Sequence, residues 1–224
     1  MRKQTIVLVV SVLIAAGAGV ALGHQWSRTA PAVTTTSQPA VAQPTTAIWP
    51  YASSATRFGD PVTAARAFAT EYLGFTSPIV GAFQRGDTRS GEVPVRASAN
   101  GVVTTILVRQ VTSDDSWWIL GATSPDIVLT TPSALAAITS PVHFAGRSTA
   151  FEAVVNVAVR QDGATTPLAT GTVHGGSMGV MGPFSSSLPF TAAPHHAGAI
   201  VLWTVSAKDG SVVTASALRV AFHA

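Results

Sequence analysis

The chain has 224 residues, of which 47% are hydrophobic, only 10% are charged and none is cysteine. The lack of cysteine excludes disulfides, thiolate zinc sites, iron–sulfur clusters, a cysteine nucleophile and a lipoprotein anchor. The net charge is +3, to which Arg2 and Lys3 contribute two units, and the rest of the chain has no basic stripe. Nucleic acid is therefore not expected as a partner.

Residues 1–25 are typical of an export signal or a membrane anchor. Arg2 and Lys3 precede Ile6–Gly23, a run of 18 residues without a charge. Its length lies between the apolar core of a signal peptide, about 7–15 residues, and a membrane-spanning helix of about 20. The basic leader orients the N-terminus inward. We expect a single-pass membrane helix with the body outside the cytoplasm, and a cleaved signal peptide with secretion as the alternative.

Residues 26–57 are predicted to form a disordered linker. The segment is rich in Thr, Ala, Ser and Pro, and it shows neither helical nor strand periodicity. It also lacks the apolar content needed to form a packed core. A flexible coil of this length spans roughly 30 Å. Such a tether would lift the following body off a membrane and into a cell wall.

A small α+β domain is expected over residues 58–125. Asp60 and Pro61 are typical of a helix N-cap and first helical position, and Gly74 is typical of a helix end. The pattern therefore predicts a helix that ends at Leu73. Its apolar face consists of residues three and four positions apart, namely Val62, Ala65, Phe68, Ala69 and Tyr72.

Strand patterns follow this helix. Strands are predicted over residues 92–98, 102–111 and 116–121, and Asn100-Gly101 is a hairpin signal between the first two. One helix packed on a three- or four-stranded antiparallel sheet is the simplest arrangement. A domain of roughly 65 residues is marginal in size for independent stability. We therefore expect it to pack against the following domain and to be stabilised by that contact.

Residues 126–224 have the pattern of an all-β sandwich. Turn signals recur at the spacing typical of that architecture, and no helical pattern interrupts them. Phe151, Ala153, Val155, Val157 and Val159 alternate with polar residues and are expected to share one face. The seven predicted strands are Asp126–Thr130, Val142–Gly146, Ala150–Arg160, Pro167–Val173, Pro183–Phe190, Gly198–Ser206 and Val212–His223.

Short segments of this half resemble a known family. They are Ile138–Val142, Gly146, Ala150–Glu152, Gly182–Phe184, Leu188–Phe190 and Ser206–Gly210. Together they resemble the Gmad family, the immunoglobulin-like domain of bacterial spore-germination and other envelope proteins. The resemblance implies an immunoglobulin-like sandwich and an extracytoplasmic, non-enzymatic module without catalytic residues. The expected fold class is thus mainly β, with this sandwich preceded by the linker and the small α+β domain.

One motif invites a catalytic interpretation. Gly175-Gly176-Ser177-Met178-Gly179 matches G-x-S-x-G, the nucleophile elbow of serine hydrolases. That elbow requires a strand before the serine and a helix after it. Because Gly182-Pro183 follows so closely, a helix cannot form there. A loop between strands is the favoured interpretation, and a secreted hydrolase that uses Ser177 is the alternative.

The sequence also offers weak candidates for a metal site and for a cell-adhesion site. His195 and His196 are adjacent, so on a strand they would face opposite sides, and His143 is expected to face solvent. Asp114-Asp115 provides two carboxylates where calcium needs six to eight oxygens. Arg85-Gly86-Asp87 spells an adhesion tripeptide but is followed by residues of an ordinary polar turn. No metal and no cofactor is expected.

Trp117 and Trp118 are the candidate ligand-contact residues. On a strand their side chains point to opposite sides, so we expect one in the core and the other more exposed. An exposed aromatic ring can stack on a sugar or anchor a protein partner.

The predicted function is that of a membrane-tethered, non-enzymatic binding module of the cell envelope. The partner would be a cell-wall polymer or another envelope protein. A spacer or accessory subunit of an envelope complex is the alternative that involves no ligand.

Overall fold

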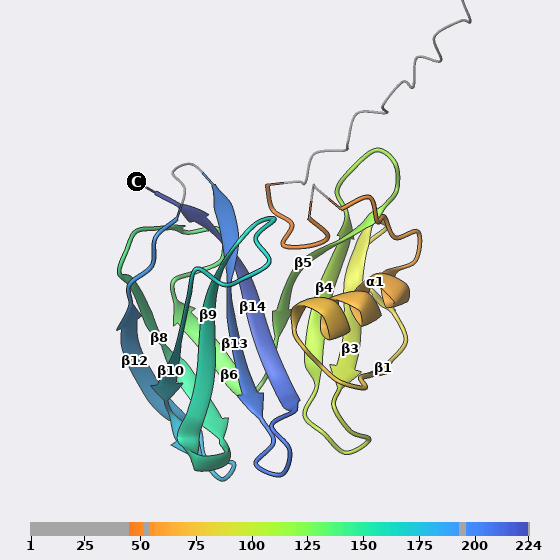
Figure 1. Ribbon diagram of the computed structural model, residues 1–224. Helices are drawn as coiled ribbons and strands as arrows, with labels where there is room; N and C mark the ends of the chain where they lie inside the picture. The colour runs from red at the N-terminus through yellow and green to blue at the C-terminus, as the bar shows by residue number, and fades with distance from the viewer. Residues whose placement is uncertain (1–44, 52–53, 193–195, 224) are drawn as a thin grey trace, which may run out of the picture. The chain divides into compact units, whose positions relative to one another are not determined.

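The computed structural model describes residues 45–51, 54–192 and 196–223 (Figure 1). The predicted anchor at residues 1–25 and the first part of the predicted linker lie outside these residues. In the part of the chain that is described, no helix is both long and apolar enough to cross a membrane.

The predicted helix is present, but its second part is π-helical instead of α-helical. Helix α1 spans Pro61–Ala67 and continues as a π-helical turn, η1, over Phe68–Tyr72. Asp60 caps the helix, because its Oδ1 accepts a hydrogen bond of 2.7 Å from the Thr63 amide. Gly74 follows with a φ of +86°, a left-handed conformation that glycine adopts at little steric cost.

The sheet beside this helix contains the three predicted strands and two short additional ones. The strands β3, β4 and β5 pair antiparallel in that order, which confirms the prediction for this segment. The strands β1 and β2 pair with the outer edge of β3. Figure 1 shows α1 lying across one face of this sheet. The bounds are β1 Ile79–Val80, β2 Gln84–Arg85, β3 Ser90–Arg96, β4 Thr104–Gln110 and β5 Trp117–Thr123.

All seven predicted strands of the C-terminal half are present, with shifted ends. Two further strands of two residues each, β7 and β11, had no sequence signal of their own. The bounds are β6 Ile127–Thr131, β7 Ala137–Ile138, β8 Val142–Ala150, β9 Val154–Gln161, β10 Ala169–His174, β11 Gly176–Ser177, β12 Gly182–Leu188, β13 Ala197–Val205 and β14 Val212–Phe222.

These strands form two packed sheets. One contains β14, β13, β9 and β10 in that order, and the other contains β6, β8 and β12 with β11 beside β8. Side chains from both sheets meet in one buried cluster, which is the packing of a β-sandwich. The cluster includes Ile127, Phe144, Val155, Val157, Val159, Phe184, Ile200, Leu202, Val220 and Phe222.

The predicted alternation fails at the start of β9. Val155, Val157 and Val159 are buried as expected, but Phe151 is 55% exposed. The structure forms a short 3-10 turn, η2, over Phe151–Ala153 between β8 and β9. Because the chain turns there, the period-two alternation of a strand starts only at Val154.

The two halves share a sheet and part of a core. Ala122 on β5 pairs with Ala217 on β14, so strands of both halves join in one ten-stranded sheet. On β13, Ile200 and Leu202 face the sandwich core, whereas Ala199 and Val201 belong to the cluster under α1. This confirms the expectation that the α+β domain packs against the C-terminal sandwich.

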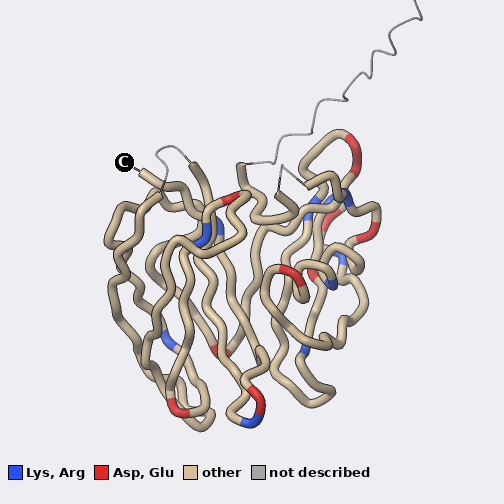
Figure 2. The backbone as a smooth tube through the Cα atoms, in the orientation of Figure 1, with Lys and Arg blue, Asp and Glu red and all other residues tan. Residues whose placement is uncertain are grey.

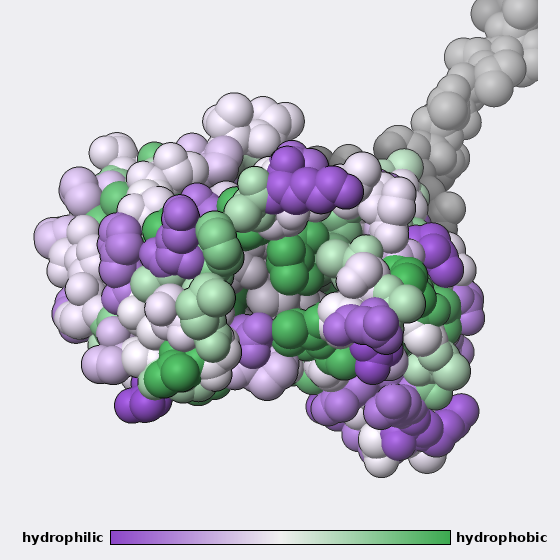
Figure 3. All heavy atoms as spheres, turned by 90° about the horizontal axis from the view of Figure 1, so that it is seen from below, coloured by the Kyte–Doolittle hydropathy of each residue, from purple (hydrophilic) through white to green (hydrophobic). Residues whose placement is uncertain are grey.

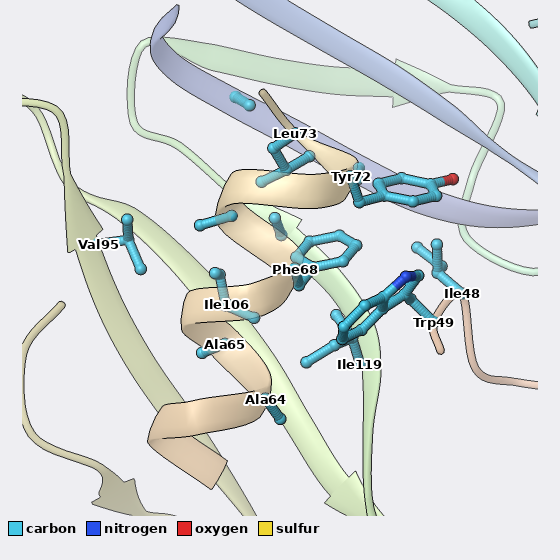
Figure 4. Close-up of a cluster of buried hydrophobic side chains, with 14 of the residues drawn as sticks. Ile48, Trp49, Ala64, Ala65, Phe68, Tyr72, Leu73, Val95, Ile106 and Ile119 are labelled. Carbon is cyan, nitrogen blue, oxygen red and sulfur yellow. The ribbon is translucent and has the colours of Figure 1, made fainter. Parts of the chain in front are cut away.

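The end of the predicted linker is part of this core. Ala47, Ile48 and Trp49 are 0%, 0% and 7% exposed, and Figure 4 shows Ile48 and Trp49 beside Phe68 of η1. The Ile48 amide donates to the Ile119 carbonyl at 2.7 Å. Residues 47–49 therefore pair with β5 and do not belong to a linker. A short apolar segment among prolines carries too little periodicity for sequence analysis to detect it.

Candidate functional site

The expectation that Trp117 or Trp118 lies exposed is wrong. Trp117 is 9% exposed and packs edge-on against Phe83, with the ring centroids 5.2 Å apart. Trp118 is fully buried, and its indole N–H donates to the Thr112 hydroxyl at 3.0 Å. The two side chains do point to opposite sides of β5. Trp118 lies under the Arg57 guanidinium, which is 5.0 Å from the ring centroid.

Ser177 does not lie on a nucleophile elbow. It belongs to β11, which pairs parallel with the end of β8. The Ser177 carbonyl accepts a hydrogen bond of 2.9 Å from the Val180 amide, which closes a turn, and β12 follows at Gly182. Because a turn and a strand follow the serine instead of a helix, the geometry does not support the hydrolase alternative.

The histidines that the structure describes do not gather with other potential metal ligands. No group of three or more His, Asp or Glu residues suited to a metal occurs among the described residues. His143 is exposed on β8, and its Nδ1 lies 3.3 Å from the Ser187 hydroxyl. His196 and His223 line a hollow of about 510 Å³ that has no carboxylate in its wall. His195 lies outside the described residues.

The remaining sequence candidates are turns. The Asp114 carboxylate accepts from the Ser116 amide at 3.1 Å, and Asp115 pairs with Arg89 at 3.1 Å. Asp87 of the Arg-Gly-Asp tripeptide accepts from the Arg89 amide at 2.7 Å in the exposed loop between β2 and β3. These carboxylates organise their own loops, as Asp often does in turns.

A pocket of about 300 Å³ lies where the two halves of the molecule meet, and we call it the junction pocket. Strands β4, β5, β6, β13 and β14 and the segment after β6 form its wall. Most of the lining is aliphatic, and the only charged side chain in it is that of Arg219. The lining includes Leu107, Leu120, Ala122, Val128, Leu129 and Leu202. A site of this composition suits an uncharged apolar group.

A chain of buried hydroxyl groups runs beside the pocket. The Thr104 and Thr214 hydroxyls are 3.0 Å apart, and Thr214 donates to the Ser124 hydroxyl at 2.7 Å. Ser216 accepts from the Ser124 amide at 3.1 Å and donates to the Ile127 carbonyl at 2.8 Å. These hydroxyls are satisfied by hydrogen bonds within the group, which link β4 and β6 to β14. They are therefore not free to bind a ligand.

The positive charge of Arg219 is also neutralised by an ion pair with Asp162. Its side chain is 5% exposed, and it donates to the Asp162 carboxylate at 2.6 Å and to the Thr45 carbonyl at 2.8 Å. Burial raises the pKa of Asp162, and the hydrogen bond and charge of Arg219 oppose that shift. Since Arg219 is paired, the junction pocket presents no free charge to a ligand.

The buried phenol of Tyr72 and the half-buried phenol of Tyr51 lie near this ion pair. Burial raises the pKa of Tyr72 well above its ordinary value of 10.0, and burial also raises the pKa of Tyr51. Arg160 donates to the Tyr72 carbonyl at 2.8 Å and lies 4.7 Å from the centroid of its ring. Both phenols therefore stay neutral near pH 7 and stabilise the packing around η1.

An exposed apolar surface projects from the sandwich at the loop between β10 and β12. Met178 is 76% exposed, Val180 is 70% exposed and the neighbouring Phe151 is 55% exposed. We call these three residues the apolar tip. Figure 3 views the molecule from the end where this loop lies, and hydrophobic residues are exposed there among hydrophilic ones. The sequence predicts a loop between strands here, and the apolar residues within this glycine-rich loop are the signal that could have indicated an exposed apolar surface.

Two packed antiparallel sheets of this size define the class of immunoglobulin-like β-sandwich domains. Residues 126–211 match the family model of Gmad2, the immunoglobulin-like domain of bacterial spore germination. The match confirms the resemblance predicted for the C-terminal half, and this family is not a known enzyme family. Neither a curated protein nor a solved structure matches the chain.

Proposed function

We propose that the chain is a non-enzymatic binding module of the bacterial cell envelope, held at the membrane by residues 1–25. The observation that carries the proposal is the match of residues 126–211 to the immunoglobulin-like domain of bacterial spore germination. The order of Arg2 and Lys3 before the apolar run supports a body outside the cytoplasm.

The surface chemistry favours a protein partner over a cell-wall polymer. Recognition of a sugar polymer uses exposed aromatic faces together with polar groups. Of the described aromatic side chains, only Phe151 is strongly exposed. The junction pocket presents no unpaired charge and the apolar tip consists of uncharged side chains, which suits an apolar segment of another envelope protein. Figure 2 shows Lys and Arg scattered over the backbone, an arrangement that does not favour a polyanion.

The proposal is tested with the full chain and two envelope fractions, purified cell wall and purified membrane. We expect retention on the membrane fraction, and protease treatment of intact cells should degrade the body. Val128→Asp places a charge at the rim of the junction pocket and should reduce the amount of other envelope proteins recovered with the full chain from detergent-solubilised membranes, because the anchor alone does not hold such a partner. Ile79→Asp is the matched control, because Ile79 is 47% exposed against 44% for Val128 and lies outside the pocket.

Three outcomes would contradict the proposal. Retention on neither fraction excludes a binding module, and a body protected from protease in intact cells excludes the extracytoplasmic location. A spacer is indicated if residues 45–224 can be replaced by an unrelated domain of similar size without loss of the complex in which the chain works.

A further inference from the structure

Strand β6 is an edge strand of the smaller sheet. Among the described strands it pairs only with β8. The Ile127 amide donates to the Ser124 carbonyl at 3.3 Å and the Ile127 carbonyl accepts from the Ser216 hydroxyl at 2.8 Å, so both main-chain groups point away from β8. Because main-chain groups alternate in direction along a strand, those of Leu129 also point away from β8. No hydrogen bond to them is found among the described residues, which leaves a free edge at Leu129.

This free edge lies beside the junction pocket. Leu129 lines the pocket on the β6 side, and Leu107 and Leu120 line it on the side of β4 and β5. An extended segment that pairs with Leu129 therefore lies above Leu107 and Leu120. Every second side chain of such a segment enters a pocket of about 300 Å³ whose lining is mostly aliphatic.

The smaller sheet ends before it covers β4 and β5. On β4, Ile106 and Val108 face α1 and are 0% and 1% exposed, and Figure 4 shows Ile106 under the helix. Leu107 points to the opposite face of the strand and is only half-buried. The smaller sheet packs on β13 and β14, and β6 is its last strand on this side. A strand added to β6 continues the same sandwich packing over β4 and β5.

Positive charge lies further along this face. A second hollow of about 450 Å³ shares Leu107 and Leu120 with the junction pocket, so the two hollows adjoin. Arg85 and Arg109 line it, and neither forms an ion pair with another described residue. Glu92 is the single carboxylate in the described part of its wall, so two guanidinium groups outnumber it. The hollow therefore favours an acidic group on the segment that reaches it.

We propose that the partner envelope protein donates an extended strand to the free edge of β6. The main chain of that strand pairs with Leu129, its alternate apolar side chains enter the junction pocket, and an acidic residue reaches Arg109. Strand addition of this kind combines main-chain hydrogen bonds, which give affinity, with side-chain pockets, which give specificity. The inference rests on the proposed function, because it names the chemistry of the partner segment and the way in which it binds.

The test uses the full chain in detergent, with a phage-displayed library of random short peptides as the probe. We expect the selected peptides to alternate apolar and polar residues and to carry an acidic residue. Leu107→Asp places a charge in the pocket wall and should weaken a selected peptide by at least about tenfold, because it opposes the burial of an aliphatic side chain. Thr105→Asp is the matched control, since Thr105 is half-buried on the same face of β4 and lines neither hollow.

Methylation of the peptide backbone tests the strand pairing directly. A selected peptide is synthesised in two forms, N-methylated at either its odd or its even positions, and binding is measured by fluorescence anisotropy. Only the N–H groups that face β6 take part in the pairing. One form should therefore lose at least about tenfold in affinity, and the other should bind nearly as well as the unmodified peptide.

Reversal of charge tests the role of Arg109. Arg109→Glu should weaken the acidic peptide and strengthen the same peptide with lysine in place of its acidic residue. Arg109 is exposed, so far-UV circular dichroism of this variant should be unchanged. A preference that stays the same after the reversal would remove Arg109 from the site.

The proposal is overturned if the library yields no binder, if Thr105→Asp weakens binding as much as Leu107→Asp, or if the two methylated forms bind equally. These results are separate from the proposed function. Envelope proteins that are recovered with the wild-type chain and lost with Val128→Asp would retain the binding module and reject strand addition alone. If no envelope protein is recovered either, both proposals fail.

Discussion

At the scale of single residues, Thr214 has an unusual position. Its hydroxyl lies between those of Thr104 and Ser124, which belong to the other half of the molecule, and it is 1% exposed. The Ala215 amide also donates to the Thr104 hydroxyl at 3.1 Å. The hydroxyl of Thr214 therefore connects β4, β14 and the segment before β6 at a single point.

Thr214→Val should lower the free energy of unfolding by about 1–3 kcal/mol, because it keeps the shape of the side chain but removes one hydrogen bond from each of the buried Thr104 and Ser124 hydroxyls. Urea denaturation measures the change. Thr214→Ser keeps the hydroxyl and should cost less. The combination with Thr104→Val should cost less than the sum of the two single changes, and strict additivity would show that the two hydroxyls are not coupled.

The raised pKa values of Tyr72 and Tyr51 predict that stability depends on pH in the alkaline range. The pKa of Tyr72 is raised by burial and by Tyr51, so this phenol stays protonated in the folded chain when the unfolded chain begins to ionise near 10.0. The unfolded state then binds fewer protons than the folded state. Its contribution to stability is present below that pH and is lost as the pH rises above it.

We therefore expect the free energy of unfolding to fall between about pH 9 and pH 11, and Tyr72→Phe should make this fall shallower. Urea denaturation at several pH values gives the two slopes. Tyr51→Phe should have a similar but smaller effect, since its burial is less complete. Equal slopes in the wild type and in Tyr72→Phe would contradict the assignment.

At the scale of elements, the segment from Thr45 to Tyr51 acts as an additional edge of the fold. Trp49 stacks on Phe58 with the ring centroids 5.1 Å apart and contacts Phe68 at 6.0 Å. The Ile119 amide donates to the Trp49 carbonyl at 2.8 Å. Figure 4 shows the indole ring between η1 and β5, so the segment closes one side of the core under α1.

Trp49→Ala should cost about 3–5 kcal/mol, as is typical for removing a large aromatic side chain from a core. The midpoint of urea denaturation provides the measurement. Trp49→Phe should lose less, and Ser98→Ala in the exposed loop between β3 and β4 serves as a control. A Trp49→Ala chain as stable as the wild type would mean that residues 47–49 act as a linker after all.

At the scale of the whole molecule, β13 and β14 belong to two cores at once. Val201 and Ala217 contact the cluster under α1, and Leu202 and Val220 contact the cluster inside the sandwich. The described residues accordingly form one compact unit by their internal contacts. Neither half can lose its core without exposing one face of these two strands.

The described body should therefore unfold in a single transition. Tryptophan fluorescence reports mainly on the α+β half, through Trp49, Trp117 and Trp118, whereas far-UV circular dichroism reports on strands of both halves. We expect the two signals to give the same midpoint, and Thr214→Val should shift both together. Separate midpoints would indicate that the halves unfold independently.

Local chemistry in the sequence was enough to predict most elements. Asp60 and Gly74 bound the helix, and alternation along the chain identified the strands, because caps and side-chain periodicity depend on residues a few positions apart. The segments that resemble the Gmad family are also local, and they were sufficient to identify the sandwich. The composition alone excludes disulfides, because the chain has no cysteine, and its near-neutral body is the reason that no polyanion partner is expected.

The tertiary structure decided which surfaces remain free. Trp118 lies under Arg57, Trp49 lies against Phe68, and Phe151 turns outward beside Met178, and each outcome depends on contacts that the strand pattern does not encode. The junction pocket likewise combines β4 and β5 with β14, about a hundred residues away in the chain. Burial is a property of contacts between distant segments, so the candidate binding face emerged only when those segments were packed together.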